Sequence, residues 1–180
     1  LLVYGHMDLI SPRSLCYTYA VTQQEKDNVM TTVLQAKETI DNAIQNFKEG
    51  PTFGYGTINA INFAVNSEIQ LRDYLIGLPN NHELDICSGF LSYLTTELPA
   101  EDSYGLDTVN AIFQYELGNL EMCAQLLEKV SMTNSDYSLA QLVRRAVSAG
   151  WPASTFATMR QELAPKVIAH LNEIGENLIA

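Results

Sequence analysis

The sequence has few cysteines and few histidines, and this shortage excludes several classes of protein. Three cysteines and three histidines are spread over 180 residues. Cys16, Cys87 and Cys123 form no CxxC pair, so neither a disulfide framework nor a cysteine-rich zinc site is expected. An odd and dispersed set of cysteines is typical of a reducing compartment. We therefore expect a cytoplasmic protein.

Basic residues are also scarce. Ten Lys and Arg stand against 21 Asp and Glu, which gives a formal net charge of −11 and a pI near 4.5. So acidic a surface repels phosphate backbones and anionic lipid heads, which argues against nucleic acid and membrane surfaces as partners. Solubility alone could also explain the charge.

Long apolar runs are missing too. No segment approaches the roughly 20 apolar residues of a membrane span. The opening "LLVYGHMDLISPRS" lacks a charged region followed by an apolar run, so it does not read as a secretory signal. Because no Met stands first, the chain is expected to be a fragment of a longer protein or to have vector-derived first residues.

Alternating β-strand patterns are absent, and helical spacing takes their place. The closest approach to a strand is "LLVY" at the start, whereas apolar residues elsewhere recur at helical intervals. With 47% hydrophobic and 17% charged residues, the chain can bury a substantial core. We predict an all-α fold, a compact bundle of about eight helices.

The long first helix has clear start and stop signals. Thr22-Gln23-Gln24-Glu25 has the form of a capping box, and Gly50-Pro51 ends the pattern. Further helices are expected over 57–64, 68–78, 82–99, 102–118, 119–130, 136–150, 153–163 and 164–178, the first two of these being separate or one bent helix. We divide the chain into an N-terminal segment with the long helix (1–50) and a helical bundle (51–180), within one domain overall.

Residues 115–142, "YELGNLEMCAQLLEKVSMTNSDYSLAQL", predict a helix hairpin. Gly118 supplies the turn, and Ala111 and Cys123 are the small residues where two helices cross closely. This order is typical of a tetratricopeptide-like repeat of about 34 residues. Shifted by that period the pattern is degenerate, so we expect one hairpin inside a compact bundle rather than a solenoid of three or more repeats.

Several short motifs point to one family. They are "LRDYLIGL" (71–78), "ELP" (97–99), "YELGNLEMCAQLLEKV" (115–130) and "YSLAQLVRRAVSAGWP" (137–152). In this order and spacing they resemble the actinobacterial domain-of-unknown-function family four-one-nine-two. The opening "LVYGHMDLISPRSL" is similar to that family's Val-Tyr-x-Gly…Pro-Ser-Arg element, which argues against a vector-derived start. The resemblance implies an upstream α/β portion that is absent here, and it supplies no catalytic residue, because the family has no known activity.

Motifs for metal, phosphate and nucleophilic chemistry are incomplete. His82-Glu83 opens like a zinc-protease motif, but Ile86 stands where the second His is required. "GPTFGYG" (50–56) lacks the Lys-Ser/Thr ending of a phosphate-binding loop, and no Gly-x-Ser-x-Gly elbow occurs. His82 is instead expected to be an exposed residue in the first turn of a helix. We predict no catalytic residue, no cofactor and no metal ligand.

Four acids crowd one loop and helix start: Glu97, Glu101, Asp102 and Asp107. Paired carboxylates can divide acid and base roles when their environments separate their pKa values. Helix N-termini also favour acids through capping and the helix dipole, and we prefer this simpler interpretation. Asp102 or Ser103 is the expected N-cap.

Two charged pairs are candidate structural or binding residues. Arg72 and Asp73 are adjacent on a helix and point about 100° apart, so each is expected to pair with a different neighbour and link helices. An external ligand is the alternative. Arg144-Arg145 is the only doubled basic site. It would either neutralise the acids near 97–107 or form part of a recognition face.

Tyr137 and Trp151 bracket the helix that contains those two arginines. Trp, Tyr and Arg are the residue types most frequent at binding hot spots. We therefore predict that a partner contacts Arg144, Arg145, Tyr137 and Trp151. Alternatively, Trp151, immediately before Pro152, is a core residue that fills a corner between helices.

Three classes of function stay open. We favour a non-catalytic protein-interaction or scaffolding module with an unidentified protein partner. The second is the helical or regulatory part of an enzyme whose active groups lie upstream. The third is a bundle with a small-ligand pocket lined by Phe53, Tyr55, Phe63 and Phe90. A groove with exposed aromatic residues would favour the first, and a cavity with convergent polar groups the third.

Overall fold

The fold is all-α, as predicted. The computed structural model describes residues 23–51 and 53–179, with side chains over 32–174. The described part consists of helices joined by short loops: α1 (Gln23–Glu49), α2 (Tyr55–Ser67), α3 (Ile69–Gly77), the 3₁₀ turn η1 (Leu78–Asn80), α4 (Leu84–Thr96), α5 (Tyr104–Glu116), α6 (Leu120–Thr133), α7 (Ser138–Ser148) and α8 (Ala153–Ile179). None of these helices has both the length and the apolar composition needed to cross a bilayer.

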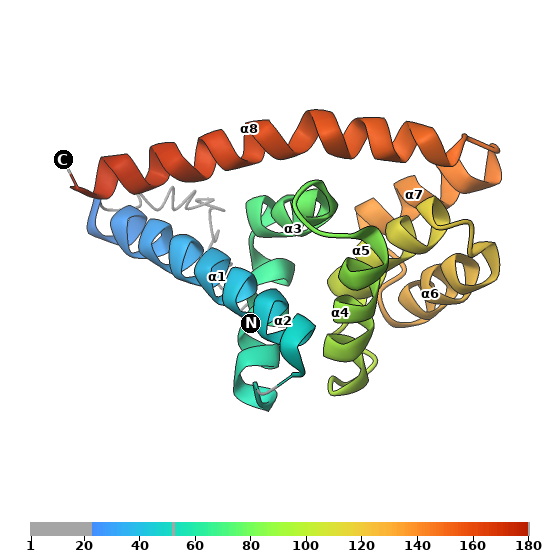
Figure 1. Ribbon diagram of the computed structural model, residues 1–180, viewed down its shortest axis with the longest axis horizontal. Coiled ribbons are helices and arrows are strands. Elements are labelled where there is room, and N and C mark those ends of the chain that lie inside the picture. Colours follow the sequence, from blue (N-terminus) through green and yellow to red (C-terminus); the bar gives the residue numbers. More distant parts are fainter. Residues whose placement is uncertain (1–22, 52, 180) are drawn as a thin grey trace, which may run out of the picture.

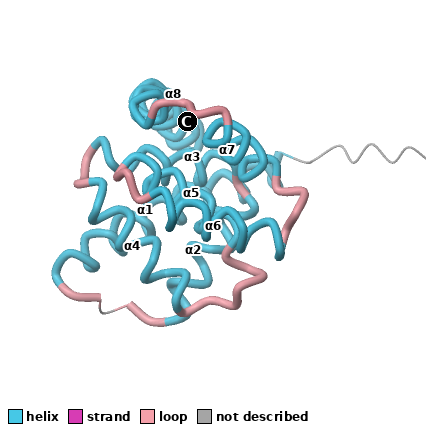
Figure 2. The backbone as a smooth tube through the Cα atoms, turned by 90° about the vertical axis from the view of Figure 1, so that its right-hand side faces the viewer, coloured by secondary structure: helices cyan, strands magenta, loops and turns pink. Residues whose placement is uncertain are grey.

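The long helix α8 lies across the rest of the bundle. It contacts α1, α3, α5 and η1 and runs along one side of the molecule, with α1 converging on its C-terminal end (Figure 1). Seen nearly end-on, α8 lies above the other helices (Figure 2).

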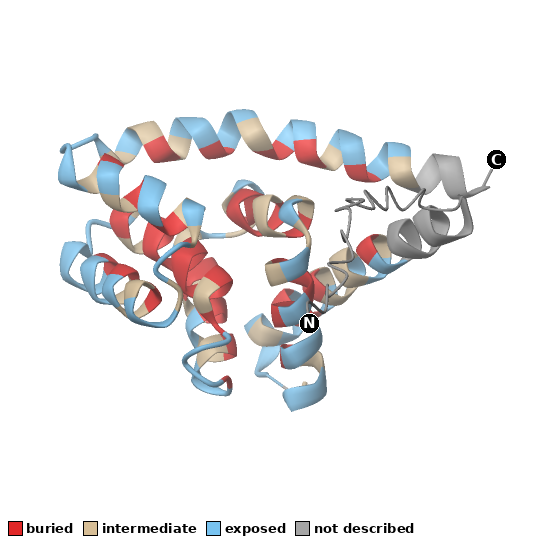
Figure 3. Ribbon diagram, turned by 180° about the vertical axis from the view of Figure 1, so that it is seen from behind, coloured by how far each residue is buried: buried red, intermediate tan, exposed pale blue. Residues whose placement is uncertain are grey.

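The core centres on α5, which contacts α2, α3, α4, α6, α7 and α8. Buried residues gather on the helices beneath α8 and on the inward edge of α8 itself (Figure 3). Phe90 and Phe113 are the largest fully buried side chains. Ile40 and Ile44 of α1 belong to the same core as the later helices. The first long helix is therefore part of one continuous core.

The predicted hairpin is formed by α5 and α6. At its turn Gly118 has φ +81°, with its N–H donating to the Tyr115 carbonyl and the Asn119 N–H donating to the Gln114 carbonyl. This pair of bonds is the Schellman arrangement, in which glycine takes the left-handed position. Ala111 and Cys123 are both fully buried, as predicted. The tetratricopeptide character of the hairpin stays a prediction.

The expected break near residue 164 was wrong, because α8 continues through Pro165. Pro165 is exposed, and so is Gln161, whose carbonyl loses its helical donor and can bind water instead. Four apolar residues of α8 are buried against the bundle: Phe156, Ala164, Val167 and Leu171. Their burial holds both halves in one helix and offsets the cost of the proline.

Other boundary predictions have mixed outcomes. Residues 57–78 form two helices, α2 and α3, rather than one bent helix. Ser103, not Asp102, precedes α5 as its N-cap residue. Thr22 of the predicted capping box, the opening motif over 2–15 and Cys16 lie outside the described residues.

Candidate functional site

An apolar groove lies between α7 and α8, with a volume of about 400 Å³. We call it the α7–α8 groove. Buried Ile112, Val143 and Phe156 form its floor. Large side chains line its rim and stay exposed: Leu142 by 50%, Trp151 by 44% and Met159 by 48%. Three such residues around one hollow leave a sizeable apolar surface in contact with water.

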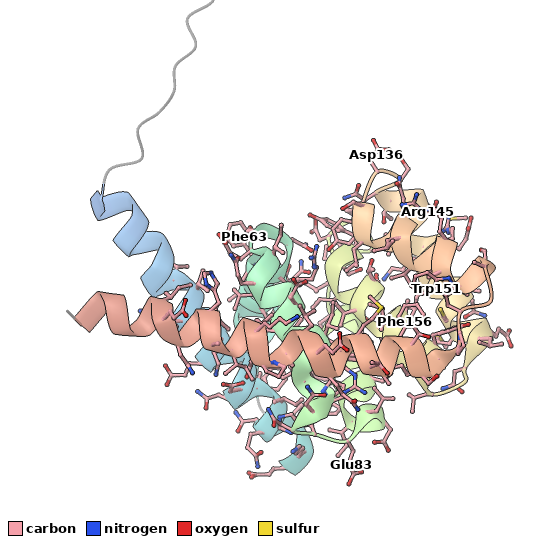
Figure 4. All side chains as sticks on the ribbon, turned by 90° about the horizontal axis from the view of Figure 1, so that it is seen from above. Phe63, Glu83, Asp136, Arg145, Trp151 and Phe156 are labelled. Carbon is pink, nitrogen blue, oxygen red and sulfur yellow. The ribbon has the colours of Figure 1, made fainter. Side chains whose placement is uncertain are left out.

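Trp151 is a rim residue and not a core residue, so the alternative in which it fills a helix corner is wrong. Gly150 has φ +71°, and the Trp151 N–H donates to the Ala146 carbonyl, which closes the end of α7. The Tyr115 hydroxyl donates to the Trp151 carbonyl at 2.6 Å. These bonds fix the backbone and leave the indole near Phe156 where α8 begins (Figure 4).

Of the four predicted partner-binding residues, only Trp151 lines the groove. Arg144 ties α7 to α6, since it donates to Ser131 Oγ at 2.9 Å and to the Leu127 carbonyl at 2.6 Å. It also lies 3.5 Å from a carboxylate oxygen of Glu128. Arg145 is exposed, and among the described residues its side chain bonds only within its own helix, to the Gln141 carbonyl. In the described structure neither arginine pairs with the acids near 97–107.

Arg72 and Asp73 pair with each other, which the prediction of separate partners missed, whereas the predicted link between helices is present through Arg72 and Tyr137. Arg72 Nε and Nη2 donate to Asp73 Oδ1 at 3.0 and 2.8 Å. The long arginine side chain spans the angle between the two positions on the helix. Arg72 also contacts the Tyr137 hydroxyl, and burial raises the pKa of Tyr137. Tyr137 stacks edge-on with Tyr104 at 4.9 Å, so it is a packing residue between helices.

The acidic cluster divides into two kinds of residue. Glu97, Glu101 and Asp102 are exposed, but Asp107 is buried, which the helix-end interpretation missed. The Lys129 ammonium lies 2.7 Å from Asp107 Oδ2, and Ser103 donates to the same oxygen at 2.7 Å.

Lys129 also lies 2.9 Å from the Ser103 hydroxyl, a spacing that nucleophile and base pairs share. Ser103 is fully buried, however, and the Lys129 ammonium is paired with Asp107, so we interpret this cluster as a structural contact that joins α5 to α6.

A second hollow, which we call the α1–α4 hollow, opens where the end of α1 meets η1 and the start of α4. Its volume is about 570 Å³. The residues that line it are Phe47, Lys48, Asn80, Asn81, His82, Glu83 and Ile86. It shares Asn81 and His82 with a smaller hollow beside α8. His82 is half-buried in the turn before α4 rather than exposed within the helix as expected.

Charged groups in and beside the α1–α4 hollow are closely paired. Lys48 Nζ lies 2.7 Å from His82 Nδ1. Burial, followed by the charge of Lys48, lowers the pKa of His82, so the imidazole is a neutral acceptor at pH 7. Asp41 accepts from Lys37 at 2.7 Å and from the Tyr74 hydroxyl. Burial and the bond to Asp41 raise the pKa of Tyr74, which keeps the phenol protonated.

Arg160 connects the two hollows. Its guanidinium lines the α7–α8 groove and pairs with Glu116 at 2.8 Å, both side chains being buried. On its other side Nη1 donates to Asn80 Oδ1 at 2.7 Å, and Asn80 lines the α1–α4 hollow. The ion pair with Glu116 therefore fixes Arg160, which lines the groove, and through it Asn80, which lines the hollow.

Among the described residues, no three His, Cys, Asp or Glu side chains are placed to share a metal ion. Burial raises the pKa of Cys87 to about 12 and of Cys123 to about 11, so neither is a reactive thiolate.

The aromatic pocket considered from the sequence is not assembled. Phe53 and Phe90 pack edge-on at 6.4 Å. Tyr55 and Phe63 are exposed, and Phe63 lines a hollow that contains none of the other three.

The comparisons add no relative: the chain has no match among family models, curated proteins or solved structures.

Proposed function

We propose that the chain is a non-catalytic protein-interaction module whose α7–α8 groove binds one amphipathic helix of a partner protein. The observation that carries this proposal is the group of half-exposed Leu142, Trp151 and Met159 around an apolar floor. Single exposed apolar residues are ordinary on a protein surface. A group of them around a groove is typical of a contact surface.

The shape of the groove favours a helix as the occupant. Its walls are two helices, and a volume of about 400 Å³ takes two or three large side chains. Helices bind such grooves through apolar residues spaced three, four and seven positions apart. The described part of the chain has no strand whose edge could bind an extended peptide.

The charges on the chain and on the groove rim indicate which kind of helix would bind. The net charge of −11 steers basic segments toward the molecule. On the groove rim Glu162 and Lys166 pair with no charged residue that the structure describes. A partner helix with mostly basic flanks and one acid could pair with both, which would fix its direction in the groove. We therefore propose a basic amphipathic helix.

Selection from a displayed peptide library tests this proposal, and the single tryptophan reports on binding. Selected peptides should have apolar residues at helical spacing and a net positive charge. On binding, the emission of Trp151 should shift to shorter wavelength as water leaves the indole. Leu142→Ser together with Met159→Ser should weaken binding by about 100-fold, because two buried apolar contacts are lost.

Met132→Ser is the matched control, since Met132 is exposed on α6 and does not line the groove. It should leave the affinity unchanged. Peptides that bind the double variant as tightly as the parent chain, or a library that yields no binder, would disprove the proposal.

A further inference from the structure

The α1–α4 hollow is rich in hydrogen-bond donors. Lys48, Asn80, Asn81 and His82 can all donate into it, whereas Glu83 is the one acid that lines it. In a chain with twice as many acids as bases, such a concentration of donors is unusual. Lys48, Asn80 and Asn81 are exposed and His82 is half-buried, so their N–H groups are accessible to a ligand. One cation and several amide and ring donors around a single hollow favour an anionic ligand.

Several of these donors have N–H groups that no described residue uses, and a ligand could accept from them. Asn80 Oδ1 accepts from the buried Arg160, which leaves its Nδ2 without an acceptor among the described residues. The Asn81 side chain bonds to no described group. Lys48 has three N–H donors, and its contact to His82 uses one of them. The orientation of Asn80 is therefore set before any ligand arrives.

Two acids lie in or beside the hollow, Asp41 and Glu83, and neither prevents an anion from binding. Asp41 is already paired with Lys37 and accepts from Tyr74. Glu83 is exposed at the rim, where water screens its charge. The remaining cation is Lys48, so the hollow balances one negative charge better than two. Phe47 and Ile86 add half-buried apolar surface to the same walls.

We propose that the α1–α4 hollow binds a small organic carboxylate. Its carboxylate would accept from Lys48 and from the amides of Asn80 and Asn81, with its apolar body against Phe47 and Ile86. The volume of about 570 Å³ lies within the range of small-ligand pockets. This site is independent of the α7–α8 groove, because the two share none of their lining residues.

Binding should take up a proton. In the free protein burial and Lys48 lower the pKa of His82, while Asp41 acts in the opposite direction. A bound carboxylate adds a negative charge beside the ring and raises that pKa. Glu83 also faces the hollow, but its charge is present in both states. Affinity should therefore increase as the pH falls through the ordinary histidine range, near about 6.5.

Titration with benzoate, acetate and inorganic phosphate, followed through the histidine ring signals in NMR spectra, tests the site. His82→Gln identifies the signal of His82 among those of the three histidines. Benzoate should shift it saturably, more tightly at lower pH, and acetate should bind more weakly because it lacks the apolar body. Lys48→Met should weaken benzoate binding by about tenfold or more, the effect of losing a hydrogen bond to a charged group.

Lys166→Met is the matched control, because Lys166 is an exposed lysine that lines the other hollow. It should leave benzoate affinity unchanged. Three results would overturn the proposal: no saturable shift between about pH 5 and 8, equal affinity in Lys48→Met and the parent chain, or phosphate binding more tightly than benzoate.

Discussion

The α7–α8 groove and the α1–α4 hollow differ in which parts of a helix form their walls. The groove lies between the sides of α7 and α8. The apolar faces of these helices are wider than the area that the core covers, so part of each face remains in contact with water. The hollow lies at helix ends, where α1 stops, η1 turns and α4 begins. Helix ends collect polar turn residues and unpaired backbone groups. One fold thus produces an apolar surface suited to a helix and a polar surface suited to a small anion.

The two surfaces nevertheless depend on one residue. Arg160 pairs with Glu116 beneath the groove and orients Asn80 at the hollow. A change at Arg160 should affect both surfaces, while changes elsewhere should affect them separately.

The largest effect is expected for Arg160→Met. It leaves the Glu116 carboxylate buried without a partner, which should lower the free energy of unfolding by ~3–5 kcal/mol. Urea denaturation measures this loss, and both peptide and benzoate affinity should fall. Arg160→Met combined with Glu116→Leu removes both charges and should recover most of the stability. Peptide binding should return with it, but benzoate binding should not, because Asn80 stays unrestrained. A loss below about 1 kcal/mol in the single variant would show that the pair is not buried in solution.

Gly77→Ala should separate α3 from α8, and so displace the helix that lines the groove and carries Arg160, which orients Asn80 at the hollow. A Cβ at Gly77 would lie 2.8 Å from the Cβ of Ala164, closer than two carbons can pack. We expect a loss of ~1–3 kcal/mol, measured by urea denaturation. Gly56→Ala is the matched control, since a Cβ there meets nothing within 4 Å, and it should be neutral or slightly stabilising. Equal stability in the two variants would contradict the close crossing.

Cys123→Leu should act on the groove alone. Cys123 is fully buried on α6, which contacts α5 and α7 but none of the elements around the hollow. Overpacking should cost ~1–3 kcal/mol and weaken peptide binding, while benzoate affinity stays the same. In a Cys16→Ser background, thiol reagents should label the parent chain much faster in urea than in buffer. Rapid labelling in buffer would contradict the burial of Cys87 and Cys123.

The sequence was sufficient for the fold class because helical periodicity is local. The apolar face of each helix can be recognised from the spacing of its own residues. Gly118 and Gly150 mark turns because glycine readily adopts the positive φ that a helix end of this kind requires. The break at Pro165 was predicted wrongly because the cost of an exposed proline is local, whereas the burial that offsets it comes from α3 and other helices. Periodicity carries no information about such partners.

The candidate sites were harder to predict. Trp151 stood out by residue type, but its neighbour in the groove, Met159, belongs to a helix whose packing the sequence does not reveal. The hollow draws Lys48 from α1 and residues 80–86 from η1 and α4, positions that no motif connects. The polar stretch "PNNHE" (79–83) was the available signal, since loops of this kind often contain binding residues. The pattern around His82 indicated an incomplete zinc motif and an exposed helix residue, and neither points to an anion site.

The smallest effects are expected at Arg144 and Arg145, which separate structural from binding roles on α7. Arg144→Glu loses the bonds to Ser131 and to the Leu127 carbonyl and places an acid beside Glu128, so it should cost about 1–2 kcal/mol. Arg145→Glu should change the free energy of unfolding by no more than ~0.5 kcal/mol, because Arg145 is exposed and, in the part of the chain that the structure describes, bonds only within α7. Neither residue lines the groove, so each variant should bind a selected basic peptide as tightly as the parent chain, or slightly more tightly through the added acid. The Trp151 emission shift measures this affinity. If Arg145→Glu instead loses binding by more than about tenfold while its urea midpoint is unchanged, the partner reaches beyond the groove onto the outer face of α7, as the doubled arginine first suggested.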